Sequence, residues 1–411
     1  MTMRRRYRRV LWAALIAGAM LVGSAPAAFA HGERAQEAYL RMRTVAWIDV
    51  SFSKTTVKQG ETFTITGTAK ILNAWPTNLA AGDPNTGYIG IIAPGPVVLL
   101  KERTINGVSA PSRIDVCRGC IYEFSMVVAG RRPGKWHVHP SFSIKGSGTL
   151  LGPGEFVTVE ENPDGFSNPV TLAESGSTIN LENYQLSFTW IWLVLTFLIG
   201  LAWMIYWTVP KRTVTNLAVT SQIPLNTDGM DYGLITKKDH RNMNWFALGT
   251  ALLLLAGWIY QAQAFPTKIP QQIFQFAPPQ PAIAKAPVFA EVGLGSADYD
   301  SANKTMTIQV PVTNTGQTPM DLQQFTTTTL KFATGTAAGP GVMTVAPSAT
   351  VEPGSSPTML TLTMKDPIWE EELLVPIGES QLLITGVLVF ETPDGQVNYA
   401  ELEANLKPRF D

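Results

Sequence analysis

The stretch 188–206, FTWIWLVLTFLIGLAWMIY, decides the architecture of this chain. It lies inside a longer segment, 183–210, that contains no charged residue. A run of this kind can span a bilayer, whereas a helix buried in a soluble core rarely stays free of charge over more than about 18 residues. Aromatic side chains near both ends are typical of membrane interfaces. We predict a transmembrane helix over 184–208.

A second uncharged run follows at Asn242–Thr267, with Leu252–Leu255 at its centre. Trp245 lies at one end and Trp258 toward the other, so aromatic residues again mark two membrane interfaces. We predict a second transmembrane helix over 244–265. The lipid bilayer is therefore an expected partner of this protein.

The segment between the two predicted helices, 209–243, carries positive charges close to both membrane ends. They are Lys211, Arg212, Lys237, Lys238 and Arg241. Because basic residues are retained on the cytoplasmic side, this segment is predicted to be a cytoplasmic loop. The chain before the first helix and after the second is then extracytoplasmic.

The N-terminus independently predicts the same topology. A cluster of arginines precedes the apolar run Val10–Val22, and Ala28–Ala30 is the small-x-small pattern that signal peptidases cut. We predict a signal peptide over 1–30 and a mature chain that begins at His31. Removal of the signal peptide lowers the number of Lys and Arg residues from 31 to 26, whereas the number of Asp and Glu residues stays at 32. This acidic balance argues against a polyanionic partner such as nucleic acid.

The first exported part, 31–180, has the pattern of β-structure. Segments such as Thr44–Phe52 and Thr62–Leu72 are rich in β-branched and aromatic residues, and Gly and Pro separate them. Short strands recur up to Phe156–Val159, with Lys135–His139 among them. This rhythm predicts a sandwich or a small barrel.

The part after the second predicted helix begins with a proline-rich connector, 266–287, which we expect to be extended. A second β-domain is predicted over 288–411. Its expected strands are Lys304–Val312, Thr326–Phe332, Met359–Met364 and a hairpin, Leu382–Leu402, that turns at Pro393–Gly395. This domain contains no His and no Cys, so it is expected to serve packing and docking without metal ligands. The predicted fold class is mainly β plus membrane helices, with two transmembrane helices connecting two β-sandwich domains.

The two cysteines, Cys117 and Cys120, both lie in the first exported domain. A close pair in an oxidising compartment usually forms a disulfide, which is the interpretation we favour. A metal site built from this pair alone would lack two ligands of a closed tetrahedral set, and two free thiols are the remaining alternative.

Three of the 4 histidines fall in the first exported domain. His240 lies instead in the predicted cytoplasmic loop, where a solvated surface role is expected. His137 and His139 have i, i+2 spacing, which on a β-strand points both imidazoles to the same face. His31 becomes the N-terminal residue after cleavage, so its ring and its α-amino group can bind a metal together.

This set of nitrogen donors predicts a copper site at His31, His137 and His139. An all-nitrogen set of tetragonal geometry favours Cu(II), with zinc as the competing metal. The α-amine titrates at about 7.7 when free, so copper binding should weaken as the pH falls. The sequence lacks the motifs of standard hydrolases, kinases and dehydrogenases. A blue-copper carrier would need a cysteine at the metal, and neither cysteine lies near His137 in the chain.

Several further stretches resemble one known family. They are Ala30–Arg34, Arg41–Thr44, Arg131–Pro140, Asn168–Thr171 and Leu181–Tyr184. The most specific is Arg131–Pro140, which reads RRPGKWHVHP. Together these stretches resemble the B subunit of the copper membrane monooxygenases, which include the particulate methane and ammonia monooxygenases and related short-alkane enzymes. The resemblance covers nearly the whole mature chain.

The resemblance implies two cupredoxin-like domains, with copper bound by the residues that are His31, His137 and His139 here. It also implies two integral membrane partner subunits, of the A and C types, in a trimer of three-subunit protomers. Such a complex hydroxylates methane, ammonia or a short alkane with dioxygen, and its catalytic centre lies either in this subunit or in a partner. Methane-oxidising relatives carry two further histidines where this chain has Ala46 and Lys70, so a second copper site is not expected here.

Two other hypotheses remain at this point. An exported, membrane-tethered copper carrier could also use an N-terminal histidine on a β-barrel, although the second outer domain weighs against it. Alternatively, the subunit is mainly a scaffold that docks its partners through the outer domains. The hypotheses differ in which proteins should copurify with the chain and in whether the histidines matter for turnover.

Overall fold

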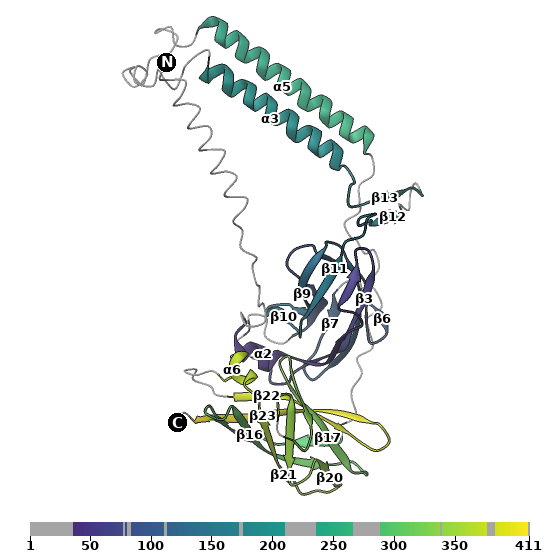
Figure 1. Ribbon diagram of the computed structural model, residues 1–411, viewed down its shortest axis with the longest axis vertical. Coiled ribbons are helices and arrows are strands. Elements are labelled where there is room, and N and C mark those ends of the chain that lie inside the picture. The colour runs from purple at the N-terminus through teal and green to yellow at the C-terminus, as the bar shows by residue number, and fades with distance from the viewer. Residues whose placement is uncertain are drawn as a thin grey trace, which may run out of the picture. The chain divides into compact units, whose positions relative to one another are not determined.

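The computed structural model describes most of the chain outside the predicted leader and connectors. The described residues are 36–76, 79, 84–110, 113–171, 176–209, 236–265, 288–337, 339–375 and 383–409. The predicted signal peptide, the proline-rich connector, most of the loop between the helices, and His31 lie outside these ranges. The described part is mainly β-structure with two long apolar helices, which confirms the predicted fold class. The two β-domains pack into one compact unit, while the helices belong to a second unit that starts at Phe166 (Figure 1).

The first β-domain is a sandwich of two sheets. One sheet has the order β1-β3-β8-β5-β6, formed by β1 (Val45–Phe52), β3 (Thr62–Ile71), β8 (Ile121–Gly130), β5 (Val98–Ile105) and β6 (Val108–Ser109). The other has the order β2-β11-β9-β4-β7, formed by β2 (Thr56–Lys58), β11 (Glu155–Glu160), β9 (Gly134–Ile144), β4 (Thr86–Ile92) and β7 (Ile114–Asp115). Strand β10 (Gly148–Leu151) pairs with β9 as a hairpin. Alternating side chains such as Phe63, Ile65, Tyr122 and Phe142 fill the space between the sheets.

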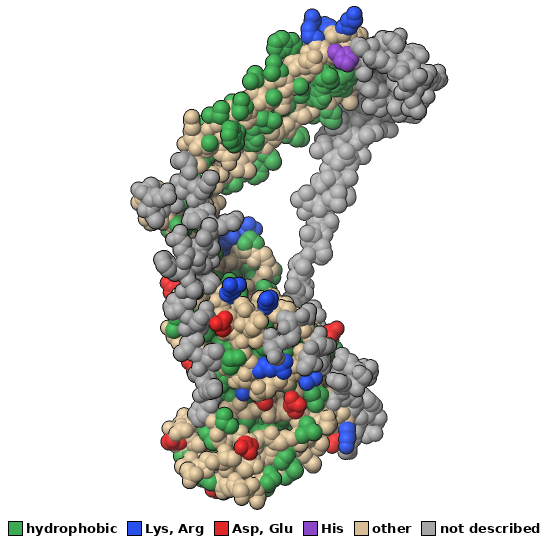
Figure 2. Space-filling model, turned by 180° about the vertical axis from the view of Figure 1, so that it is seen from behind, with side chains coloured by type: hydrophobic (Ala, Val, Ile, Leu, Met, Phe, Trp, Pro, Cys, Tyr) green, Lys and Arg blue, Asp and Glu red, His purple; other side chains and the backbone are tan. Residues whose placement is uncertain are grey.

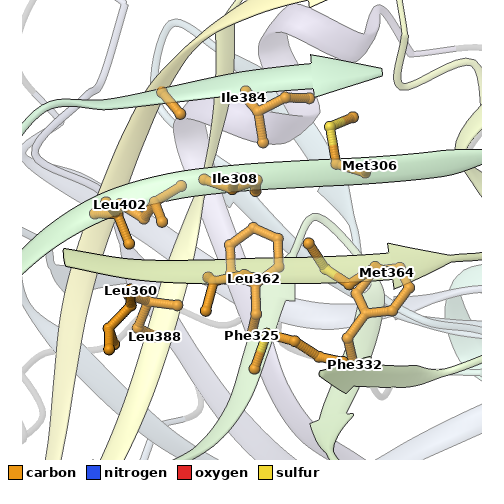
Figure 3. Close-up of a cluster of buried hydrophobic side chains, with 14 of the residues drawn as sticks. Met306, Ile308, Phe325, Phe332, Leu360, Leu362, Met364, Ile384, Leu388 and Leu402 are labelled. Carbon is orange, nitrogen blue, oxygen red and sulfur yellow. The ribbon is translucent and has the colours of Figure 1, made fainter. Parts of the chain in front are cut away.

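The second β-domain is a sandwich whose layers belong to one continuous sheet. Its order is β14-β16-β15-β23-β22-β17-β18-β19-β21, and β21 pairs back to β16, so the sheet closes on itself. The strands are β14 (Ala290–Val292), β15 (Gly295–Asp300), β16 (Thr305–Asn314), β17 (Met320–Thr327), β18 (Leu330–Thr334), β19 (Val342–Ala346), β20 (Thr350–Val351), β21 (Thr358–Lys365), β22 (Leu383–Glu391) and β23 (Val397–Arg409). A short helix, α6 (Ile368–Glu371), follows β21. Figure 3 shows the core of this domain, where Met306, Phe325, Phe332 and Leu362 are packed together.

Two turns of this domain bear on the sequence-based expectations. The single strand expected over Thr326–Phe332 is wrong, because Thr328 adopts a φ of 52° and the chain turns there from β17 into β18. The hairpin expected near Pro393–Gly395 is confirmed, since β22 and β23 pair across it and Gly395 takes a φ of 80°.

The two β-domains share a continuous interface. Strand β1 is buried on both faces: Val45 and Trp47 point into the first domain's core, while Ala46 and Ile48 form a separate buried cluster with residues of β22. The sequence did not predict the short helix α2 (Ala38–Thr44) that precedes β1. The two domains therefore contact each other through both β1 and α2.

The second unit contains α3 (Leu186–Thr208) and α5 (Lys237–Ala264), both long and apolar enough to cross a membrane. Figure 2 shows hydrophobic side chains over these helices, with Lys, Arg and His at one end. Helix α5 begins before the expected span because Thr236 and Asp239 form a capping box. The hairpin of β12 (Pro169–Thr171) and β13 (Thr178–Asn180) belongs to this unit, although the sequence had placed it in the first domain.

Candidate metal centre

Strand β9 places the histidine pair in the middle of the second sheet. His137 lies opposite Phe156 of β11, and His139 lies opposite Ile92 of β4. Val138, between the two histidines, is fully buried in the domain core. Both imidazoles therefore occupy the outer face of the sheet, as the i, i+2 spacing predicted.

The two imidazoles converge on each other. His139 Nε2 lies 3.1 Å from His137 Nδ1, and the ring centroids are 4.2 Å apart. Imidazole nitrogens bind metals such as zinc at about 2.0–2.1 Å, so two nitrogens at this separation can bind the same ion. In the structure the two nitrogens lie within hydrogen-bonding distance of each other, and this separation is also short enough for both to contact one ion.

A backbone carbonyl fixes the orientation of His139. Its Nδ1 lies 3.0 Å from the carbonyl oxygen of Gly152. A carbonyl oxygen can only accept, so Nδ1 carries the proton and donates, and the lone pair of the neutral ring is at Nε2. This second contact is the one that metal-binding histidines commonly make, because it holds the ring and its tautomer in place.

Gly154 makes room for the ring of His139, a residue that is only 3% exposed, and Gly152 makes room for Trp47. A Cβ at Gly154 would lie 2.4 Å from Nδ1 of His139, and a Cβ at Gly152 would lie 2.8 Å from the Trp47 ring. Any side chain at Gly154 would therefore displace the imidazole. Sequence reasoning missed this role, although the Gly152-Pro153-Gly154 stretch before β11 was a visible signal.

His137 has a more open environment than His139. Its ring stacks on Phe156 with centroids 4.5 Å apart, and Phe156 is 45% exposed. The ammonium of Lys135 lies 5.0 Å from the centroid of the same Phe156 ring. The histidine pair thus has one buried member and one near the surface, and an ion could be approached from the side of His137.

The third predicted ligand, His31, lies outside the described residues. Within the part of the chain that the structure describes, no group of three His, Cys, Asp or Glu side chains could hold a metal ion. The first described residue, Gln36, is attached to the end of β10, which precedes Gly152, the residue whose carbonyl contacts His139. Its side chain donates to the carbonyl of Thr149, and its Oε1 accepts from the amide of Leu151 at 3.3 Å.

The two cysteines form a disulfide in the structure. Cys117 and Cys120 lie in the loop that leads into β8, a strand of the sheet opposite to that of the histidines. The amide of Cys117 donates to the hydroxyl of Tyr122 at 3.0 Å. Burial raises the pKa of Tyr122 to about 12.

Ala46 and Lys70 lie directly opposite each other on β1 and β3. The ammonium of Lys70 donates to the carbonyl of Tyr399 at 2.8 Å and lies 3.2 Å from Oε1 of Glu401. An ammonium has no lone pair for a metal, so this pair of positions offers no ligand. His240, the remaining histidine, lies in the first turns of α5, in the other compact unit.

A family model and a relative of known name identify the family of this chain. The family model for the B-subunit protein of monooxygenases matches residues 32–410. The chain is 31% identical over 399 residues to the particulate methane monooxygenase alpha subunit of Methylococcus capsulatus, with 94% of each chain covered. The solved cupredoxin domain of amoB from Nitrosocaldus yellowstonii is 17% identical with a TM-score of 0.25, covering 33% of this chain and 98% of that chain. The chain belongs to the B-subunit family of monooxygenases and is one component of a membrane monooxygenase.

Proposed function

We propose that this chain is the copper-binding subunit of a membrane complex that hydroxylates a small substrate with dioxygen. The copper ligands in this proposal are His137, His139 and His31, with His31 exposed as the mature N-terminus by cleavage after Ala30. The observation that carries the proposal is the 3.1 Å separation of two imidazole nitrogens, one of which is oriented by the Gly152 carbonyl.

The attachment of Gln36 supports the participation of His31. Gln36 accepts from Leu151, the residue next to Gly152, whose carbonyl orients His139. His31 lies five positions before Gln36 in the chain, and an extended chain of five steps reaches roughly 17 Å. His31 is therefore within reach of the histidine pair.

The donor set fits copper better than the alternatives on chemical grounds. Imidazoles and an α-amine give nitrogen ligands only, which suit Cu(II). When bound, copper would supply redox chemistry with dioxygen. The chain's own contribution is to hold His139 by its Nδ1–H bond, to keep the ring buried, and to leave the side of His137 accessible.

The assembly that we propose follows from the family and the helices. Two partner membrane subunits of types A and C would join this chain in a trimer of heterotrimers, with methane, ammonia or a short alkane as substrate. Both β-domains would lie outside the cytoplasm and the segment between α3 and α5 inside, in line with the distribution of basic residues.

Metal analysis of the complex, purified in mild detergent, tests the proposal. The copper content and the electron paramagnetic resonance spectrum should be measured for the wild type and for His139→Ala. His240→Ala serves as the control, because this histidine lies in the other compact unit. We expect nitrogen-coordinated copper that His139→Ala removes and His240→Ala retains, and a mature N-terminus at His31 by mass spectrometry. A wild-type protein without nitrogen-bound copper would contradict the proposal.

The same preparation separates the other two hypotheses. A copper carrier would purify without partner subunits and release its copper readily. A scaffold would sustain oxidation of methane, ammonia or butane by the assembled complex after replacement of His137 and His139. Loss of turnover with the assembly preserved would instead support a functional copper.

A further inference from the structure

We propose that the Cys117–Cys120 disulfide is a redox-sensitive switch for the docking of the two β-domains. Thiol–disulfide exchange with a dithiol opens the loop 117–120 and so loosens the end of β3, which binds Glu401 of the second domain. The inference goes beyond the copper proposal and does not depend on it, because none of these residues is a proposed metal ligand.

The disulfide closes a short loop that is bonded to the end of β3. The amide of Gly119 donates to the carbonyl of Ile71 at 2.7 Å, and the amide of Ile71 donates to the carbonyl of Cys120 at 3.0 Å. Gly119 adopts a φ of 72°, a conformation that glycine takes without steric cost. Ile71 is fully buried in the core of the first domain. The loop therefore supplies both main-chain partners of the last residue of β3.

The residues on either side of Ile71 bind one carboxylate of the second domain. Lys70 Nζ lies 3.2 Å from Glu401 Oε1. Asn73 donates to the same carboxylate through its main-chain amide at 2.7 Å and through its side chain at 2.9 Å. Asn73 also lies against the loop, since a Cβ at Gly119 would be 3.0 Å from Asn73 Oδ1. The loop that the disulfide closes thus contacts a residue that docks the second domain.

The same segment contributes apolar contacts to the interface. Leu72 and Ala74 are buried in one cluster with Val387 and Val389 of β22. Because Leu72 follows Ile71 directly in the chain, a displacement of the loop affects the polar and the apolar contacts of the interface together.

The surroundings of the disulfide favour exchange with a thiol. Both cysteines are partly exposed, and Arg118 follows Cys117 directly in the chain. A neighbouring cation stabilises a thiolate relative to a thiol. The hydroxyl of Tyr122 lies 3.6 Å from Cys117 Sγ, within donating distance for sulfur. Cys117 is therefore the better leaving group of the two sulfurs.

The exchange balances in atoms and electrons. A thiolate of the dithiol attacks Cys120 Sγ to form a mixed disulfide, and the electron pair of the broken S–S bond goes to Cys117 Sγ. The second thiol of the reductant loses its proton and attacks the reductant's own sulfur in the mixed disulfide, which frees the Cys120 thiolate. The two thiolates take up the two protons that the dithiol lost. The dithiol leaves as a disulfide, and the chain gains two electrons and two protons.

Two main-chain amides report the docking directly. The amide of Asn73 donates to Glu401, and the amide of Trp47 donates to the carbonyl of Thr328 at 3.3 Å. Both acceptors belong to the second domain, so release of that domain exposes both amides to hydrogen exchange. Trp47 lies on β1 and outside the loop, so its amide distinguishes release of the domain from local loosening beside the disulfide.

Hydrogen exchange of the full-length chain within its purified complex tests the switch. Exchange is measured by fragmentation mass spectrometry with and without dithiothreitol, and in a variant that combines Cys117→Ser with Cys120→Ser. We expect reduction and the double substitution each to accelerate exchange at Asn73 and Trp47 roughly 5-fold or more, the lower range for coupling between sites. Amides that pair β16 with β21 inside the second domain are the internal control and should not change. Dithiothreitol should have no further effect on the double variant, which has lost the chain's 2 cysteines.

Reciprocity of linkage gives a second test, because a change in docking must alter the thiol–disulfide equilibrium in turn. In buffers of reduced and oxidised dithiothreitol, the fraction of disulfide is trapped by alkylation and measured by mass spectrometry. We expect Glu401→Gln to shift the equilibrium constant toward the dithiol by roughly 5-fold. Asp49→Asn is the control, because it removes an exposed ion pair with Lys331 across the same two domains. It should stay within about twofold of the wild type, since exposed pairs contribute little.

Faster exchange at Asn73 alone, or at neither amide, would overturn the switch, because the loop would then open without releasing the second domain. An equal shift of the thiol–disulfide equilibrium in Glu401→Gln and Asp49→Asn, or no shift in Glu401→Gln, would overturn it as well. A disulfide that dithiothreitol leaves closed in the native complex would exclude exchange as the trigger. If the double serine variant does not assemble, the reduced wild type and Glu401→Gln still decide the question.

Discussion

Lys70 of β3 and Glu401 of β23 form a buried ion pair that joins the two β-domains, with Nζ 3.2 Å from Oε1. Asn73 adds two more contacts to the same carboxylate, through its amide nitrogen at 2.7 Å and its side chain at 2.9 Å. Lys70 thus serves the docking of the two β-domains in this chain.

Removal of one charge from this pair should weaken the docking of the domains. Glu401→Gln leaves the Lys70 ammonium buried without its countercharge, and such losses cost roughly 3 kcal/mol. Lys70→Met combined with Glu401→Met should cost less than the sum of the single substitutions, because the buried charges leave together. Thermal unfolding of the full chain in detergent measures these effects. Additive effects of the two substitutions would show that the charges do not interact.

Gly154→Ala should disturb the proposed metal centre without unfolding the domain. Its Cβ would lie 2.4 Å from the His139 ring, so the imidazole must move away from the Gly152 carbonyl. Copper affinity should fall by roughly 10-fold to 100-fold, the range for a lost outer contact. Isothermal titration calorimetry with Cu(II) measures the affinity and checks this prediction. Gly354→Ala is the control, because a Cβ there has no neighbour within 4 Å, and an equal loss in that variant would refute the steric explanation.

Tyr206→Phe should weaken the association of α3 with α5. The hydroxyl of Tyr206 donates to Asp239 Oδ1 at 2.5 Å and accepts from the side chain of Asn242 at 3.2 Å. Loss of these bonds at a buried carboxylate should cost roughly 1–3 kcal/mol. Unfolding of the full chain by a denaturing detergent, followed by circular dichroism, measures the change. Thr208→Val, which removes a hydroxyl bonded to a carbonyl within α3, should have a smaller effect.

The ionisation of Tyr122 should limit stability at high pH. Burial raises its pKa to about 12, above the ordinary value of 10, so the folded state favours the neutral phenol. This contribution is fully present below pH 10 and is lost as the pH rises through about 12. The ultraviolet absorbance of tyrosinate should show a step near pH 12 that is missing in Tyr122→Phe. A step that persists in this variant would assign it to another tyrosine.

Local sequence determined most of the secondary structure and, in the candidate site, the shared direction of His137 and His139. The two apolar helices, the β-character of both outer domains and the turn near Gly395 follow from composition and spacing over a few residues. The common direction of His137 and His139 follows from the two-residue repeat of a strand. The hairpin at Thr328 was missed because a β-branched residue gave no local signal for a positive φ.

Tertiary structure decided which groups surround His137 and His139 and which contacts hold them in place. The Gly152 carbonyl and the space left by Gly154 come from the segment between β10 and β11, two strands that pair with β9. Gln36 is attached to β10 through its side chain. The contacts of Arg41 with Glu372 and of Lys70 with Tyr399 join residues that are 331 and 329 positions apart in the chain. Spacing along a strand fixes where a side chain points, but the partner that it meets depends on how distant strands pair and pack, and no local pattern contains that information.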